Sequence, residues 1–288
     1  MGSKINSMDK KEYSEEILEI VDNMSLMDDE LMAKVFDENL PATTLLLSTI
    51  LQREIEVEST KGQFDMRSPI VGGRSIRLDI HAKEKNGEHF DCEVQRADEG
   101  ASPKRVRFHS AMLDARMLKA GQDFDELKDS YVIFITENDY YGEGKPLYYV
   151  NRVVDDNKRF QDGNHIIYVN ASYKGNDDLG KLLKDMTNKT MSGFYNKELE
   201  DGVRHFKETK EGREIMSEAV QKFAEKYAKK YAEEYAKEYS EGQYDKGKES
   251  GVIDSIRNLM KNMKMSAEQA MDAIGIPKSE HKKYMTML

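Results

Sequence analysis

The sequence predicts a mixed α/β core followed by a helical extension, and three observations predict it. Residues 74–82 and 90–95 alternate polar and apolar side chains with the period of a β-strand. Residues 131–135 (YVIFI) form an apolar run typical of a buried strand. From about residue 177 onward the pattern is helical. Strands that alternate with helices and precede a helical stretch are typical of a mixed sheet covered by helices.

Composition and charge limit the classes of function that fit the chain. The chain has 288 residues, of which 38% are hydrophobic and 34% charged, so we expect part of it to be solvated helix. The formal net charge of -10 excludes a protein that binds nucleic acid through a generally basic surface. Any DNA contact therefore requires a local basic patch. The single cysteine, Cys92, excludes an intramolecular disulfide and a cysteine-rich zinc site.

The apolar runs are all shorter than the ~20 residues that a transmembrane helix needs. Residues 1–11 are polar and lack the apolar stretch of a secretory signal. We therefore expect no membrane partner and a cytoplasmic location. We divide the chain into a flexible or helical N-terminal segment (1–27), a core (28–175), a helical extension (176–212), and a long charged helix with a small helical tail (213–288).

The elements before the alternating strands are mostly helical. Apolar residues recur at helical spacing across residues 15–36, and Pro41 opens a further helix over residues 42–51, at a position where proline is tolerated. Residues 54–58 alternate with the period of a strand. Two later strand candidates cover residues 147–154 and 166–170.

The turn at residues 85–87 (Lys-Asn-Gly) decides how the two alternating strands pair. A two-residue Asn-Gly turn would place Glu93 on the wrong face of the hairpin, because a slip of one residue inverts every side chain. A three-residue loop with a left-handed glycine sets Asp79 opposite Glu93 and Arg77 opposite Gln95. We favour the second register because it also aligns the apolar side chains of the two strands, which are Leu78, Ile80, Ala82, Cys92 and Val94.

In this register Asp79 and Glu93 point to the same side of the hairpin. Two neighbouring carboxylates repel each other unless a cation neutralises them, and Mg²⁺ binds carboxylates, water and phosphate oxygens together. Such an ion can activate a water molecule for attack on a phosphate. Gln95 points to the same side, where its amide can orient that water or hold a phosphate oxygen. The alternative is a polar hairpin face that is only solvated.

The helix predicted over residues 103–120 is basic despite the acidic balance of the chain. Its cationic side chains are Lys104, Arg105, Arg107, His109, Arg116 and Lys119. Its predicted buried stripe, spaced three and four residues apart, is Val106, Ser110, Leu113 and Met117. We predict that Lys104, Arg105 and Arg107 bind DNA phosphates. The alternative is an ordinary solvated helix face.

Several motifs together resemble the PD-(D/E)XK nuclease family transposases, also called recombination-promoting nucleases. They are LDI at Asp79, EVQ at residues 93–95, KRVRF at 104–108, YVIFITEND from residue 131, GEGKPLYYVNR ending at Arg152, and DGNHIIYVN ending at Asn170. The resemblance covers roughly residues 28–210. It implies an α/β, restriction-endonuclease-like core, in which a mixed β-sheet is flanked by helices, with a helical C-terminal extension.

The resemblance also implies the chemistry of the site. Asp79 and Glu93 would bind Mg²⁺, with Mn²⁺ able to substitute, and Asp79, Glu93 and Gln95 would form the catalytic group. Gln95 stands where the wider superfamily usually has lysine, which removes a positive charge near the phosphate. The stretch DDELMAKVF is similar to the family's N-terminal motif, and Asp29 occupies its acidic position. The alternative for Asp29 is a helix N-cap. His81 can carry a proton or serve local packing.

The sequence leaves three functions open. The first is a Mg²⁺-dependent DNA endonuclease that promotes recombination or mobile-element transfer. The second is a nuclease fold that binds DNA without turnover, as the replacement of lysine by Gln95 would allow. The third assigns the work to the C-terminal helices, as a device for homo-oligomerisation or partner binding. There, residues 223–239 repeat an aromatic-Ala-charge-charge unit whose period of four drifts around a helix, which favours a long, charged helix.

Overall fold

The computed structural model describes residues 13–96, 98–155, 158–238 and 244–288, and it divides the chain into two compact units. One unit is Met24–Gly212, and the other joins the N-terminal residues up to Asn23 with Arg213–Leu288. Residues 1–12, which open the N-terminal segment that we expected to be flexible or helical, lie outside the described residues. None of the helices in the described ranges combines the length and the apolar character that a membrane span requires.

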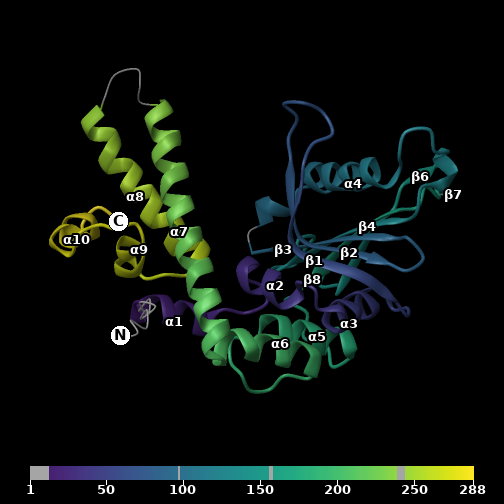
Figure 1. Cartoon of the computed structure of the whole chain (residues 1–288), viewed down its shortest axis with the longest axis horizontal. Coiled ribbons are helices and arrows are strands. Elements are labelled where there is room, and N and C mark those ends of the chain that lie inside the picture. Colours follow the sequence, from purple (N-terminus) through teal and green to yellow (C-terminus); the bar gives the residue numbers. More distant parts are fainter. Residues whose placement is uncertain (1–12, 97, 156–157, 239–243) are drawn as a thin grey trace, which may run out of the picture. The chain divides into compact units, whose positions relative to one another are not determined.

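The larger unit is built on a mixed six-stranded sheet, as the sequence predicts (Figure 1). In spatial order the strands are β1 (Val57–Met66), β2 (Ile76–Glu84), β3 (His89–Gln95), β4 (Ser130–Thr136), β8 (Asn164–Asn170) and β5 (Leu147–Val150). The central strands β3, β4 and β8 are parallel, and the outer strands pair antiparallel. A separate two-stranded ribbon joins β6 (Val153–Val154) to β7 (Lys158–Arg159).

Helices cover both faces of this sheet, so its central strand is buried along its whole length. Figure 1 shows α4 (Pro103–Met117) on one side of the sheet. On the other side lie α2 (Asp29–Phe36), α3 (Leu40–Leu51), α5 (Asp178–Thr187) and α6 (Lys197–Glu208). Two short 3₁₀ helices, η1 (Asp98–Ala101) and η2 (Phe124–Glu126), flank α4 in the chain.

The predicted three-residue hairpin loop and its register are confirmed. Gly87 is left-handed with φ 96°, and its N–H donates to the carbonyl of Glu84 at 2.9 Å. Glu84 in turn donates from its N–H to the carbonyl of Glu88 at 3.0 Å. The regular pairs then run from Lys83↔His89 to Ile80↔Cys92. Continued by one step, this register sets Asp79 beside Glu93.

The predicted apolar face of the hairpin is wrong at Leu78. We expected Leu78 beside Cys92 and Val94, but it packs in the cluster under α4 with Val106 and Phe134. The other members of that cluster are Met66, Ala101, Met112, Leu113, Val132 and Tyr168. The regular alternation of β2 therefore stops before Leu78.

The backbone around Asp79 explains this break. Gln63 on β1 stands between the pairs Gly62↔Ile80 and Phe64↔Leu78, and it is left-handed with φ 48°. A positive φ is uncommon for a residue with a side chain and interrupts the regular pleat. On its other side, Asp79 donates its N–H to the Glu93 carboxylate. The strand thus departs from ideal geometry at the residue that the family resemblance marks as a metal ligand.

Most predicted element bounds differ from the structure by only a few residues. The pattern over residues 15–36 is two helices, α1 (Glu15–Asn23) and α2, separated by a turn. The strand predicted over residues 147–154 is split into β5 and β6. The strand predicted from residue 54 begins at Val57.

The second unit is helical, as predicted. Besides α1 it contains most of α7 (Lys210–Glu238), and also α8 (Tyr244–Met263), α9 (Ala267–Ala273) and α10 (Lys278–Met285). Its core gathers Ile253, Ile256, Leu259, Met265, Ala270, Met271 and Tyr284. The helix α7 carries the aromatic-Ala repeat up to Glu238, and the last repeat position, Tyr239, lies outside the described residues.

Candidate active site

Asp79 and Glu93 are interlocked through their backbones. The N–H of Asp79 donates to Oε1 of Glu93 at 3.1 Å, and the N–H of Val94 donates to Oδ2 of Asp79 at 2.9 Å. Each carboxylate thus accepts a hydrogen bond from the neighbouring strand. Glu93 is fully buried and Asp79 is partly buried. The structure therefore brings the two predicted carboxylates together at one end of the β2–β3 hairpin.

Both carboxylates lie where a negative charge is costly. Burial raises the pKa of Asp79 well above its usual range, and repulsion from Glu93 and Asp29 raises it further. Burial also raises the pKa of Glu93 well above its usual range, and the next contribution is repulsion from Asp91. Groups in this situation favour a bound proton or a nearby cation.

Arg105 supplies one cation to this cluster from the first turn of α4. Its Nη2 donates to Oε2 of Glu93 at 2.7 Å, and its Nη1 donates to Oε1 of Gln95 at 3.1 Å. The guanidinium also lies 5.6 Å from the ring centroid of Phe134. About a third of the Arg105 side chain, 38%, is exposed. We predicted Arg105 as a DNA contact, and the structure places it beside the carboxylates.

Gln95 depends on a glycine for its position. A Cβ at Gly100 would lie 1.7 Å from Oε1 of Gln95, closer than any real contact. The carbonyl of Gly100 also accepts a hydrogen bond from Nη1 of Arg105 at 2.9 Å. Close approach of a backbone to a functional side chain is one of the physical reasons for glycine. Gly100 therefore allows Gln95 and Arg105 to meet.

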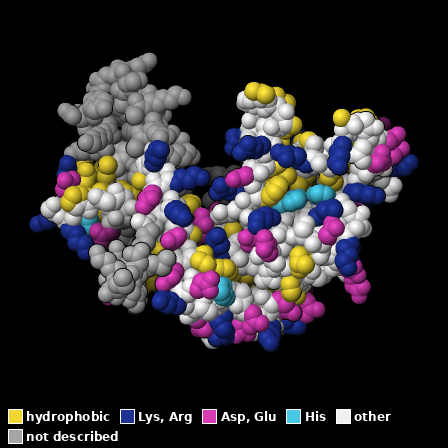
Figure 2. All heavy atoms as spheres, in the orientation of Figure 1, with side chains coloured by type: hydrophobic (Ala, Val, Ile, Leu, Met, Phe, Trp, Pro, Cys, Tyr) yellow, Lys and Arg dark blue, Asp and Glu magenta, His cyan; other side chains and the backbone are white. Residues whose placement is uncertain are grey.

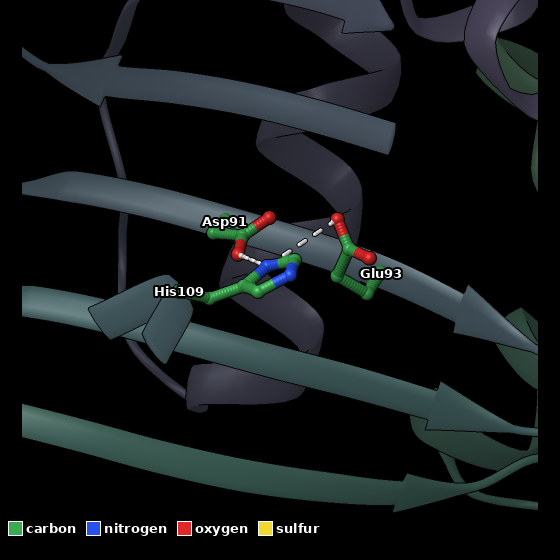
Figure 3. Close-up of side chains that lie close together, drawn as sticks. All are labelled: Asp91, Glu93 and His109. Atoms are coloured by element: carbon green, nitrogen blue, oxygen red, sulfur yellow. Dashed lines mark hydrogen bonds and ion pairs between the residues drawn. The ribbon is translucent and has the colours of Figure 1, made fainter. Parts of the chain in front are cut away.

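Sequence reasoning missed a buried pair next to Glu93, formed by Asp91 and His109. Nδ1 of His109 lies 2.8 Å from Oδ2 of Asp91 and 3.8 Å from Oε1 of Glu93. Figure 3 shows both carboxylates on β3, with the imidazole reaching them from α4. Burial lowers the pKa of His109 to about 4, with further contributions from Arg105 and Arg74. The imidazole is therefore neutral, and its contact with Asp91 is a hydrogen bond rather than an ion pair.

Two signals in the sequence could have found this pair. Asp91 alternates with Glu93, so both point to the same face of β3. His109 follows Val106 by three residues and so belongs to the buried stripe of α4. Our assignment of His109 to the basic face is therefore wrong, because its side chain is only 3% exposed.

Asp29 lies close enough to the site to influence it. Its alternative role as an N-cap is wrong, because Asp28 occupies the cap position and Asp29 is the first residue of α2. The side chain of Asp29 is exposed, but desolvation by the protein around it, followed by repulsion from Asp28 and Glu30, raises its pKa to about 6. Its charge also contributes to the raised pKa of Asp79.

His81 makes aromatic contacts. Its ring stacks on Phe64 at a centroid distance of 4.7 Å, and its Nε2 lies 3.2 Å from Nδ1 of His89. Burial, followed by the effect of His89, lowers its pKa to about 4. These contacts favour the packing role over proton transfer.

The remaining predicted DNA contacts lie on the outer face of α4. Lys104 and Arg107 are exposed, and so are Arg116 near the end of the helix and Lys119 just after it. Figure 2 shows Lys and Arg side chains gathered on the surface around α4. The buried stripe predicted for this helix is confirmed at Val106, Ser110 and Leu113.

Comparison with known proteins identifies one family. The model of the family described as PD-(D/E)XK nuclease family transposase matches residues 31–234, which is more than half of the chain. The matched residues include the whole β2–β3 hairpin and α4. No curated protein and no solved structure matches the chain.

Proposed function

The chain belongs to the PD-(D/E)XK nuclease family transposases, and from this premise we propose that it is a Mg²⁺-dependent DNA endonuclease. It hydrolyses phosphodiester bonds and thereby promotes recombination or mobile-element transfer. One observation carries the proposal: Asp79 and Glu93 interlock beside Arg105 at the end of the β2–β3 hairpin.

The donor set suits a hard divalent cation. Asp79 and Glu93 offer oxygen atoms from adjacent strands, and Mg²⁺ typically binds through one or two carboxylates with water and phosphate oxygens. Burial raises the pKa of both groups, and repulsion from Glu93 raises that of Asp79 further, so a cation bound between them would offset the cost of their negative charge. Mn²⁺ can take the same ligands. When bound, the ion lowers the pKa of a water molecule and neutralises charge on the phosphate.

Arg105 and Gln95 together take the place of the lysine that the wider superfamily uses. Arg105 has five N–H donors in a planar fork that matches a phosphate group. Its exposed part is available to a phosphate while Nη1 stays bonded to Gln95. Since Oε1 of Gln95 accepts from Arg105, the NH₂ group of its amide remains to donate to a phosphate oxygen or to hold the attacking water.

DNA binding rests on the outer face of α4. Its exposed cations Lys104 and Arg107 lie on the same helix as Arg105, so a phosphate backbone held there would pass close to the carboxylates. Such contacts provide affinity and salt sensitivity but no sequence choice. We also propose that the C-terminal helices α7 to α10 mediate homo-oligomerisation, which sedimentation of the purified protein over a range of concentrations would test.

A nicking assay on supercoiled plasmid tests the proposal. The purified protein should convert supercoiled to open-circular DNA only when Mg²⁺ is added, and Asp79→Ala should abolish this while its circular dichroism spectrum stays unchanged. Asp65→Ala, which alters an exposed aspartate on the adjacent strand β1, is the matched control and should cut normally. Equal cutting by wild type and Asp79→Ala would reject the assignment.

A catalytically inactive DNA-binding protein is the second candidate, and one contact favours it. The ion pair between Arg105 and Glu93 already neutralises a carboxylate that a metal would need. This candidate predicts salt-sensitive DNA binding without cleavage under any divalent ion.

A further inference from the structure

We propose that Asp91, Glu93 and His109 form a second cation site, which binds a divalent transition ion of the Mn²⁺, Co²⁺ and Zn²⁺ class. The site shares Glu93 with the proposed Mg²⁺ pair but uses no atom of Asp79. It does not require that the chain cuts DNA, so its success or failure is separable from that of the nuclease proposal.

The first support is geometric. One ligand atom from each of Asp91, Glu93 and His109 lies within 4.8 Å of the other two. Nδ1 of His109 is 2.8 Å from Asp91 and 3.8 Å from Glu93. Ligands at about 2.0–2.2 Å from a common ion are separated from each other by roughly 3–4 Å, depending on the coordination geometry. The observed separations fall around this range, so only small side-chain movements are needed to bind an ion.

The second support is a buried oxygen atom without a partner. Asp91 is fully buried, and its Oδ1 has no hydrogen-bond partner among the described residues. The hydrogen bond to His109 explains Oδ2. Asp91 also interacts with the side chain of Glu93, and two carboxyl groups in contact require either a shared proton or a cation between them. An unpaired buried oxygen costs free energy, and proteins seldom retain one without a reason. In Figure 3 the carboxylate of Asp91 lies next to that of Glu93, above the imidazole, where one cation would contact all three groups.

The ligand types select the kind of ion. Mg²⁺ prefers oxygen ligands and keeps several waters, which a fully buried group does not readily supply. An imidazole nitrogen combined with two carboxylates suits transition ions such as Mn²⁺, Co²⁺ and Zn²⁺. His109 is therefore the residue that should distinguish this site from the Asp79–Glu93 pair.

Binding through Nδ1 has a consequence for Arg105. A neutral imidazole that ligates an ion through Nδ1 carries its single proton on Nε2. At present Nε of Arg105, which is itself a donor, lies 3.4 Å from that Nε2. Two N–H groups would then face each other, so the guanidinium must turn away from His109 when the ion binds. Metal binding at this site would thereby release part of Arg105 from its current contacts.

Titration of the full-length protein with Co²⁺ tests the site, because Co²⁺ has visible absorption bands that report its ligands. His109→Gln should weaken Co²⁺ binding at least about tenfold and remove these bands. Asp91→Asn should have the same effect. His81→Gln removes a half-buried histidine of the β2–β3 hairpin and should leave the titration unchanged. In Asp79→Asn, Co²⁺ should still bind at this site and show the same absorption bands as in the wild type, because Asp79 is not one of its ligands.

Two results would overturn the proposal. One is an equal Co²⁺ affinity in wild type and His109→Gln. The other is loss of the bands in Asp79→Asn, which would mean that a single ion uses Asp79. If His109→Gln fails to fold, the histidine NMR signals of the wild type provide the test. As Mn²⁺ is added, the signal of His109 should broaden at a lower concentration than the signal of His165, and the reverse order would contradict the site. If the protein binds Co²⁺ through His109 but does not cut DNA, the result supports this cation site and contradicts the proposal that the chain is a nuclease.

Discussion

Asp79 donates its backbone N–H to the side chain of Glu93 at 3.1 Å, across the two strands of one hairpin. The contact exists because the loop at Gly87 sets the register, and because β2 leaves its regular geometry at Asp79. One strand thus orients the carboxylate of the other. Asp79→Ala, which removes the oxygen that accepts from Val94, should therefore also disturb the position of Glu93, whereas Asp79→Asn keeps both an oxygen acceptor and the backbone donor.

Glu93→Gln should abolish Mg²⁺-dependent cleavage without unfolding the protein. The substitution keeps the shape of a fully buried side chain but replaces a carboxyl group, which can bind a metal, with a neutral amide. Burial and repulsion from Asp91 raise the pKa of that carboxyl group well above its usual range. We expect cleavage to fall at least about 10³-fold, as for loss of a central electrostatic group. Plasmid nicking and thermal unfolding measure the two effects. Cleavage at the wild-type rate would exclude Glu93 from the catalytic group.

Arg105→Met should reduce cleavage by about 10²-fold or more, because it removes the cation beside Glu93 and Gln95. Arg105→Lys keeps the charge but loses the planar fork, so it should restore only part of the rate. Single-turnover cleavage of a short duplex at saturating protein separates this effect from DNA affinity. If both variants cut at the wild-type rate, Arg105 has no role in the chemistry.

Lys104→Met and Arg107→Met should weaken DNA binding about equally for all sequences. Each removes one exposed cation from the outer face of α4. Each should also reduce the slope of log affinity against log salt by about one. Fluorescence anisotropy at several salt concentrations measures the slope. Arg204→Met is the matched control, because Arg204 lies on α6 and pairs there with Glu200 and Glu208. A slope that changes only in the control would contradict this binding face.

Gly100→Ala should reduce cleavage through Gln95. The new Cβ would meet Oε1 of Gln95 at 1.7 Å, so the amide must move. A double-mutant cycle tests this route. If Gly100 acts only by making room for Gln95, then Gly100→Ala combined with Gln95→Ala should cut no more slowly than Gln95→Ala alone. Additive losses would show that Gly100 acts in another way.

Stability should depend on pH through Asp29. Its pKa in the fold is about 6, above the usual 3.8, so the folded protein binds this proton more tightly than the unfolded chain. The contribution of this bound proton to the free energy of unfolding is therefore complete below about pH 4 and is lost as the pH rises through 6. Asp29→Asn should remove this part of the pH dependence and raise the melting temperature at pH 7. Asp201→Asn, at an exposed position of α6, should change neither. A melting temperature lowered by Asp29→Asn at pH 7 would contradict the sign.

Much of the fold could be predicted from local patterns. The alternation of β2 and β3 and the glycine at residue 87 determine the register, because a slip of one residue would have turned Glu93 to the face opposite Asp79. The alternation could not reveal that Leu78 packs under α4, since the break depends on Gln63 in a different strand. Local rules describe single strands, whereas this departure arises from the pairing of β1 with β2.

The candidate site was only partly predictable for a similar reason. Asp79 and Glu93 belong to one hairpin, so their proximity follows from sequence. Arg105 and His109 reach the site from a helix; the spacing of His109 from Val106 indicates that it points inward, but only the packing of α4 on the sheet shows that Arg105 does. A basic residue in a helical pattern carries no sign of whether it will meet DNA or a buried carboxylate.

The most direct test of the central claim is the position of the ion itself. Crystals of the protein grown with Mn²⁺, which substitutes for Mg²⁺ and scatters anomalously, should show a peak about 2.0–2.2 Å from one oxygen of Asp79 and one of Glu93. A peak that contacts only Asp91, Glu93 and His109, or no peak near Asp79, would contradict the claim that Asp79 and Glu93 share one divalent ion.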